Sequence, residues 1–196
     1  MQIPSVHEAE KILTEAEMMN PGEWVSHSRV AAMCAKTIAK HCDGLDSDIA
    51  YIFALLHDVG RRVGVCGVRH VYEGYMFMLK QGYNDVARIC LTHTFPFPDI
   101  GKVSGKDDLS FAEFEFLQEE LNKVEYDDYD RLIQLCDAIA YNNGPCTVEK
   151  RLVDVAIRRG INDYTVEKWK AFLGLRDYFN KKVGGSIYTL FEDIIL

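Results

Sequence analysis

The stretch ALLHDVGRR, residues 54–62, decides how this chain is expected to fold. Apolar residues precede it at the spacing of a helix, whose start Asp46 or Ser47 can cap. The helix is expected to end at the pair His57–Asp58, and Gly60 breaks it two residues later. Because both polar side chains stand at a helix end beside a glycine, they can turn toward one common point. The stretch therefore predicts a helix that ends in a functional site.

Helical periodicity continues from this stretch toward both ends of the chain. Upstream, the sequence predicts one helix over residues 6–19 and another to about His41, with Asn20 as its N-cap and Pro21 at its first position. Downstream, Ser110 and Glu113 form a capping box for an acidic helix. The downstream helices are expected over residues 69–80, 84–94, 110–124, 129–142, 147–159 and 165–182, followed by a short helix or strand over 187–195.

No run of alternating apolar and polar residues is long enough to predict a strand. We therefore expect an all-α fold, a helical bundle in which residues 1–196 form a single domain. Residues 95–109, which contain two prolines and two glycines, are expected to form a long loop. A loop of this size is either a lid or binding segment or a plain excursion over the surface.

The amino-acid composition limits which classes of protein this chain can belong to. The 196 residues carry 22 Lys+Arg against 30 Asp+Glu, a formal charge of −8, and 48% of them are hydrophobic. This is the composition of a folded domain, and its acidic balance disfavours duplex nucleic acid and membrane surfaces as partners. No stretch resembles a membrane span or a signal peptide. Six cysteines without a Cys-x-x-Cys pair indicate reduced thiols, so we expect a cytoplasmic protein.

A set of histidines and aspartates falls on or beside the apolar faces of different predicted helices, where an unpaired imidazole is costly. The set comprises His27, His57, Asp58, His70, His93 and Asp137. Imidazole nitrogen and carboxylate oxygen together suit a divalent transition metal such as Mn, Fe, Co, Ni or Zn. A carboxylate can also bridge two ions about 3.5–4 Å apart, which clamps both reacting oxygens of a phosphoryl transfer. The set predicts a site for one or two metal ions.

Several of these residues also have an ordinary structural explanation. A histidine at a helix C-terminus complements the helix dipole, which is the alternative for His57 and His93. His27 could be a satisfied core histidine, and the Asp137 carboxylate could form a buried cap or ion pair. The two remaining histidines, His7 and His41, are expected at the surface and at a helix end.

The order of the set resembles a known family. His27, then His57–Asp58 in ALLHDVGRR, then Asp137 in LCDAIA, is similar to the H…HD…D pattern of the HD-domain superfamily of metal-dependent phosphohydrolases. The resemblance implies a helical core over about residues 20–145, with the C-terminal helices packed on it, and one metal ion held by these four residues. Two histidines in the interval, His70 and His93, correspond to ligands of a second ion in binuclear members, which Asp58 would bridge.

Two arginines follow the His–Asp pair directly. Many relatives carry a basic residue here, and the planar fork of Arg61 or Arg62 could hold a substrate phosphate. The alternative is a pair of solvated loop arginines. The resemblance implies that Asp58 bridges the metals or orients the nucleophile, and Arg61 could neutralise charge in the transition state. Asp58 and Arg61 are therefore the predicted catalytic residues.

The resemblance also implies a reaction. We expect a metal-activated water to cleave a phosphoester or phosphoanhydride of a small phosphorylated molecule, most simply a nucleotide. Two alternatives stay open. A few binuclear HD members are di-iron oxygenases that use the same His/Asp ligands, and a degenerate HD domain would serve only for binding. The sequence leaves the oligomeric state open as well.

Overall fold

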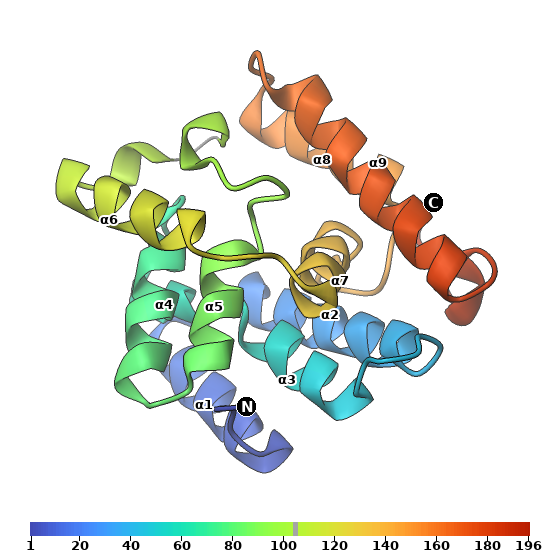
Figure 1. Cartoon of the computed structure of the whole chain (residues 1–196), viewed down its shortest axis with the longest axis horizontal. Helices are drawn as coiled ribbons and strands as arrows, with labels where there is room; N and C mark the ends of the chain where they lie inside the picture. Colours follow the sequence, from blue (N-terminus) through green and yellow to red (C-terminus); the bar gives the residue numbers. More distant parts are fainter. Residues whose placement is uncertain (104–105) are drawn as a thin grey trace.

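The computed structural model describes residues 1–103 and 106–196, and within them every regular element is helical (Figure 1). The α-helices are α1 (Val6–Met19), α2 (Glu23–Ala39), α3 (Ser47–Leu56), α4 (Arg69–Lys80), α5 (Asn84–Thr92), α6 (Phe111–Asn122), α7 (Asp128–Ala138), α8 (Val148–Arg159) and α9 (Thr165–Lys182). Four 3₁₀ turns are η1 (Val59–Val63), η2 (Ile100–Lys102), η3 (Lys106–Asp108) and η4 (Ile187–Leu190). The predicted all-α fold is confirmed.

The main core forms where α2 and α3 pack along one another, with α1 and α7 against them. Phe53 and Leu56 of α3 are fully buried, and so are Ala31 and Ala35 of α2. Because these α2 side chains are small, the two helices can approach closely and still fill the space between them. This packing fixes the end of α3, where the His–Asp pair stands.

A second apolar cluster lies between α6 and the pair α4–α5, which run side by side (Figure 1). Leu117 and Leu121 of α6 are fully buried against Phe95 and Ile100, which belong to the segment predicted as a long loop. That segment contains η2 and η3, and its residues 104–105 lie outside those that the structure describes. The long connection after α5 is therefore anchored to the fold by apolar side chains.

The N-caps of α3 and α6 are the ones that the sequence predicts. Asp46 caps α3 by accepting from the backbone N–H of Asp48 and Ile49, and Ser110 with Glu113 forms the predicted capping box of α6. The start of α2 was predicted two residues too early. Gly22 is its N-cap, without a side-chain hydrogen bond.

Asn20 is used differently from the prediction. It ends α1 as the C-cap residue, and its side-chain amide donates a hydrogen bond to the backbone carbonyl of Arg61 at 2.6 Å. The amide therefore ties the turn between α1 and α2 to the segment after the His–Asp pair. The side chain of Asn20 therefore holds this turn and is not the N-cap of α2, which is Gly22.

Four helices end earlier than predicted, and two of them, α5 at Thr92 and α6 at Asn122, do so by two residues within the predicted element. Helix α2 stops at Ala39, and α7 stops at Ala138, where Ile139 is the C-cap residue. After α7 the chain turns back, and the backbone N–H of Cys146 donates to the carbonyl of Ile139 at 2.8 Å. This turn and the isolated bridges Ala140–Pro145 and Cys146–Ile195 take up the residues that periodicity assigned to the helix.

The C-terminal third adds a helical hairpin. Helices α8 and α9 lie side by side at one edge of the molecule, and both pack against α7 (Figure 1). The predicted α8 and α9 ranges agree with the structure to within one residue, with Thr147 as the N-cap of α8. The hairpin therefore sits next to the helix that carries Asp137.

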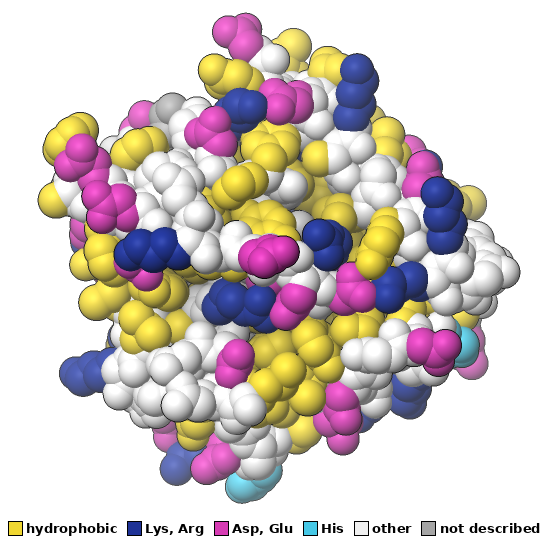
Figure 2. Space-filling model, viewed as in Figure 1, with side chains coloured by type: hydrophobic (Ala, Val, Ile, Leu, Met, Phe, Trp, Pro, Cys, Tyr) yellow, Lys and Arg dark blue, Asp and Glu magenta, His cyan; other side chains and the backbone are white. Residues whose placement is uncertain are grey.

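The described surface carries both signs of charge. On the face shown in Figure 2, basic and acidic side chains are interspersed between apolar ones. None of the helices in the described ranges combines the length and the apolar character that crossing a membrane requires. All six cysteines are free thiols, and only Cys66 among them is not buried.

Candidate metal centre

Six polar side chains from five helices converge inside the bundle. They are His27 in α2, His57 at the C-cap of α3, Asp58 next to it, His70 in α4, His93 at the C-cap of α5, and Asp137 in the last turn of α7. All are buried except Asp137, whose side chain is 25% exposed. The structure thus brings together every residue that the sequence predicted as a metal ligand.

Gly60 allows the turn after the His–Asp pair to press against α4. A Cβ atom at this position would lie 1.9 Å from the carbonyl oxygen of His70 and 2.5 Å from the backbone nitrogen of Gly74. Only a residue without a side chain fits such a close approach of two backbones. The glycine therefore fixes the separation between Asp58 and His70.

The two oxygens of Asp58 face different histidines. Its Oδ2 lies 3.8 Å from Nε2 of His57, whereas its Oδ1 lies 3.1 Å from Nε2 of His70 and 3.5 Å from Nε2 of His93. Asp58, His70 and His93 form one group whose ligand atoms lie within 4.8 Å of one another, and His27, His57 and Asp58 form another. Asp58 belongs to both groups, as a bridging carboxylate must.

On the other side of the centre, His27 and His57 face the second aspartate. Oδ1 of Asp137 lies 3.0 Å from Nε2 of His27 and 3.9 Å from Nε2 of His57. His57, His93 and Asp137 form the third group of ligand atoms within 4.8 Å. Asp137 therefore completes a continuous cluster rather than standing apart from it.

All four histidines are oriented in the same way. Nδ1 of each lies at hydrogen-bond distance from a backbone carbonyl oxygen, which can only accept. The four carbonyls belong to Ala140 for His27, Ala54 for His57, Gly67 for His70 and Cys90 for His93. In each neutral ring the proton is therefore on Nδ1, which leaves the lone pair of Nε2 directed at the centre. Carbonyls that orient histidines in this way are typical of metal sites.

The electrostatics of the cluster suit a cation. Burial lowers the pKa of His57 to about 4 and the pKa of His70 to about 3, so both rings are neutral at pH 7. Burial alone would raise the pKa of Asp58 and of Asp137. Arg61 together with the neighbouring histidines outweighs burial for Asp58, and His27 together with the other histidines outweighs it for Asp137, so both pKa values lie well below the ordinary value of a carboxyl. Neutral imidazole and ionised carboxylate are the forms that bind metal.

Two buried polar atoms at the centre have no hydrogen-bond partner among the described residues: Nε2 of His57 and Oδ1 of Asp58. A buried acceptor without a donor is costly, and here several acceptors point at one another. A divalent cation is the species that satisfies nitrogen lone pairs and carboxylate oxygens together. The donor set therefore fits one or two transition-metal ions.

Arg61 lies beside the cluster. Its Nε donates to Oδ2 of Asp58 at 2.6 Å, and one terminal nitrogen donates to the carbonyl oxygen of Cys66 at 3.2 Å. Arg62 is not brought to the site. Its guanidinium lies 4.0 Å from the ring centroid of Phe77, and it lines neither pocket described below. Nothing in its position supports a contact between Arg62 and a substrate.

Two pockets open onto the centre. One, of about 240 Å³, includes His70, Asp137 and residues of α8 and α9 in its walls. The other, of about 650 Å³, is lined by His27, Asp58 and Trp24 among others. Arg61 and Asp137 line both, so the two pockets meet at the candidate metal centre.

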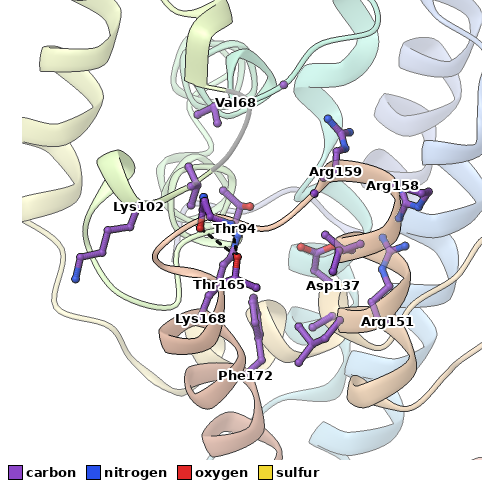
Figure 3. A pocket seen from close by; sticks show the side chains of 18 of the residues that line it. Val68, Thr94, Lys102, Asp137, Arg151, Arg158, Arg159, Thr165, Lys168 and Phe172 are labelled. Carbon is purple, nitrogen blue, oxygen red and sulfur yellow. Dashed lines mark hydrogen bonds between the residues drawn. The ribbon is translucent and has the colours of Figure 1, made fainter.

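The sequence-based prediction missed the basic residues of the C-terminal hairpin. Arg151 and Arg158 of α8 and Lys168 of α9 line the smaller pocket, where Figure 3 shows Asp137 between the arginines on one side and Lys168 on the other. The only local signal was the Arg158–Arg159 doublet at the end of a predicted helix. No spacing rule connects that doublet to the histidines, because the contact is made by tertiary packing.

Comparison with family models gives one match, to the HD domain over residues 24–142. The chain belongs to the HD-domain family. No curated protein and no solved structure gave a significant match. The matched region contains the His57–Asp58 pair and the four other converging residues. Helices α8 and α9, and the basic pocket walls that they contribute, lie beyond the matched residues.

Proposed function

We propose that the protein is a metal-dependent phosphohydrolase that acts on a phosphorylated small molecule, with a nucleotide as the expected substrate. One observation carries the proposal. Four imidazole Nε2 atoms and two carboxylates face one centre, and a pocket rich in arginine and lysine opens directly onto it. The ligands suit a transition metal, and the basic walls suit the negative charge of a phosphate.

The six clustered residues would hold the metal in two parts. His27, His57 and Asp137 would bind one ion and His70 with His93 the other, with Asp58 between them. A divalent metal bound here supplies a water of lowered pKa and polarises a phosphoryl oxygen. The backbone carbonyls behind the four rings keep each imidazole turned inward, so that the ligands need little rearrangement when the ion binds.

Asp58 and Arg61 would act on the reacting groups. The Asp58 carboxylate would orient the nucleophilic water by accepting a hydrogen bond from it. Arg61 stays charged and lies in the walls of both pockets, where its remaining N–H groups can donate to phosphate oxygens. A fixed cation at this place stabilises the negative charge that accumulates in the transition state.

A nucleotide fits the larger pocket. Its walls include the aromatic side chains of Trp24 and Tyr141 next to the polar Asn142, which together offer a stacking surface and hydrogen-bonding groups for a base. The pocket volume of about 650 Å³ lies in the range of small-molecule sites. We therefore infer that the base or sugar occupies this side of the centre.

The experiment is phosphate release from a panel of nucleotides and phosphate esters by protein reconstituted with Mn²⁺, Co²⁺, Ni²⁺ or Fe²⁺. Asp58→Asn should abolish turnover because it keeps the shape of the side chain and removes the charge. The matched control is Asp48→Asn, an exposed residue of α3 paired with Lys36, which should leave turnover unchanged. Turnover that survives in Asp58→Asn would contradict the proposal. Oxygen consumption without phosphate release would instead indicate that the protein is an iron-dependent oxygenase.

A further inference from the structure

The smaller pocket is strongly basic in an acidic protein. The chain has a formal charge of −8, yet among the described residues this pocket is lined by six Lys and Arg side chains and a single acidic one, Asp137. The six are Arg61, Lys102, Arg151, Arg158, Arg159 and Lys168. Such a local excess of positive charge against the overall balance indicates a site for an anion.

Most of these cations are already engaged by carboxylates. Arg61 pairs with Asp58, and Lys102 pairs with Glu167 at 2.8 Å. Arg151 and Arg158 both donate to Oδ2 of Asp154, at 3.3 and 2.7 Å. These pairs position the guanidinium groups but leave them less free to bind a ligand.

The Lys168 ammonium group has no hydrogen-bond or ion-pair partner in the part of the chain that the structure describes. The residue is half-buried in α9, in the pocket wall next to Trp169 and Phe172 (Figure 3). Burial lowers the pKa of Lys168, and attraction by Asp137 opposes that effect. A nearby anion stabilises the charged form of a partly buried ammonium group.

Once Asp137 binds a metal ion, it would no longer compensate the charge of Lys168. Its negative charge would then interact mainly with the metal ion, which is nearer and more strongly charged. The pocket that opens onto the metal centre would then have an uncompensated lysine in its wall. A phosphate group that extends from the centre toward α9 would supply the missing negative charge.

We propose that Lys168 binds a second phosphate of the substrate, next to the phosphate that is attacked at the metal centre. This inference rests on the proposed function and makes it more specific. It assigns the substrate to compounds with at least two consecutive phosphate groups, such as nucleoside diphosphates or triphosphates, rather than to simple monoesters. It also gives the α8–α9 hairpin, which lies outside the family match, the role of selecting that substrate.

The test measures binding, so that it does not depend on turnover. Orthophosphate and pyrophosphate are titrated calorimetrically into Mn²⁺-loaded protein, with the metal content checked after each titration. We expect pyrophosphate to bind the wild type at least tenfold more tightly than orthophosphate. Lys168→Gln should weaken pyrophosphate binding by about tenfold, the effect of losing one charge-assisted hydrogen bond, and change orthophosphate binding less than about twofold.

Two further variants make the result specific. Lys168→Arg keeps the charge and should keep most of the pyrophosphate affinity, which also shows that the position tolerates substitution. Lys170→Gln, on an exposed part of the same helix, should change neither affinity. The proposal is overturned if folded, metal-loaded Lys168→Gln binds pyrophosphate as the wild type does, if both anions weaken equally, or if the wild type binds neither anion. Lys168-dependent pyrophosphate binding without any phosphate release would instead contradict the proposed function.

Discussion

Nε2 of His70 and Nε2 of His93 lie 3.1 Å apart in the protein interior, although both rings face backbone carbonyls through Nδ1. Two neutral histidines in this tautomer present lone pairs to each other, a repulsive arrangement when nothing lies between them. Burial holds the pKa of His70 at about 3, so this ring is neutral at pH 7. A metal ion bound by these rings and by Asp58, as the proposed function requires, would remove this repulsion.

His70 is therefore predicted to control one of two metal ions. His70→Leu removes the Nε2 ligand at similar volume, and we expect the bound metal to fall from two ions per chain to one. His41→Leu is the control, because His41 is exposed at the end of α2 and its Nδ1 faces the carbonyl of Thr37. Elemental analysis after desalting gives the count. Unchanged metal content in a folded His70→Leu protein would remove His70 from the ligand set.

The stability of the metal-free protein should fall in mild acid. The pKa values of His57 and His70 are about 4 and about 3 in the folded state, both below the value of 6.5 for a free histidine. Below pH 6.5 the unfolded chain binds protons that the folded chain does not, so the stabilisation is complete above pH 6.5 and is lost as the pH falls toward 4. At pH 5 the loss is about 2 kcal/mol for each histidine.

Urea unfolding of chelator-treated protein at pH 7 and pH 5 measures this loss. His70→Leu should reduce the difference between the two pH values by about half, because one of the two titrating groups is gone. His41→Leu should leave it as in the wild type. Asp130, whose pKa burial raises to about 6, acts in the opposite direction over this range, so the comparison between variants decides: a pH difference that is the same in His70→Leu and in the wild type would show that His70 is not buried as a neutral histidine.

Gly60 is predicted to be indispensable for the geometry of the site. Gly60→Ala places a methyl group against the backbone of His70 and Gly74, neither of which can move without shifting α4. We expect a loss of several kcal/mol of stability, or no soluble protein, in the manner of overpacked cores. Gly174→Ala is the matched control, since nothing lies within 4 Å of a Cβ there and the residue is inside α9. It should raise stability by up to about 1 kcal/mol. Thermal unfolding of both variants checks the contrast.

Arg61 is predicted to act on catalysis more than on metal binding. Arg61→Gln removes the guanidinium that pairs with Oδ2 of Asp58 and borders both pockets. We expect kcat/KM to fall by roughly 10²–10³, the cost of losing one strong transition-state donor, with the metal content retained. Arg61→Lys should recover only part of the loss, because lysine cannot reproduce the planar fork. Full activity in Arg61→Gln would assign the arginine to structure alone.

The fold was largely predictable because its helices carry their own start signals and apolar faces. Asp46, Ser110 and Thr147 cap helices where a local rule places them. The errors arose where a residue served a distant partner. Asn20 was expected to cap α2, but its amide is bound to the carbonyl of Arg61, 41 positions away in the sequence. A local rule does not anticipate this long-range contact or the later start of α2, at Glu23 after Gly22.

Some residues of the candidate site were also predictable from the sequence, and others were not. The six metal-ligand candidates were recognisable because residue type and order carry the signal, and the structure brings all six together. Arg62 had the same local context as Arg61, but it turns outward onto Phe77. Lys168 lies outside the motif, and its approach to Asp137 depends on how α9 packs against α7. Chemistry encoded in a motif was predictable, whereas chemistry assembled by packing was not.

The metal content of the intact chain tests the central claim most directly. Protein purified without chelator, reconstituted with Mn²⁺ and desalted, is measured by elemental analysis beside Asp58→Asn and Asp48→Asn. We predict two ions per chain in the wild type and in Asp48→Asn, and a loss of both in Asp58→Asn because that carboxylate is shared by the two groups of ligands. Wild-type protein that retains no metal, or Asp58→Asn that retains two ions, would contradict the account.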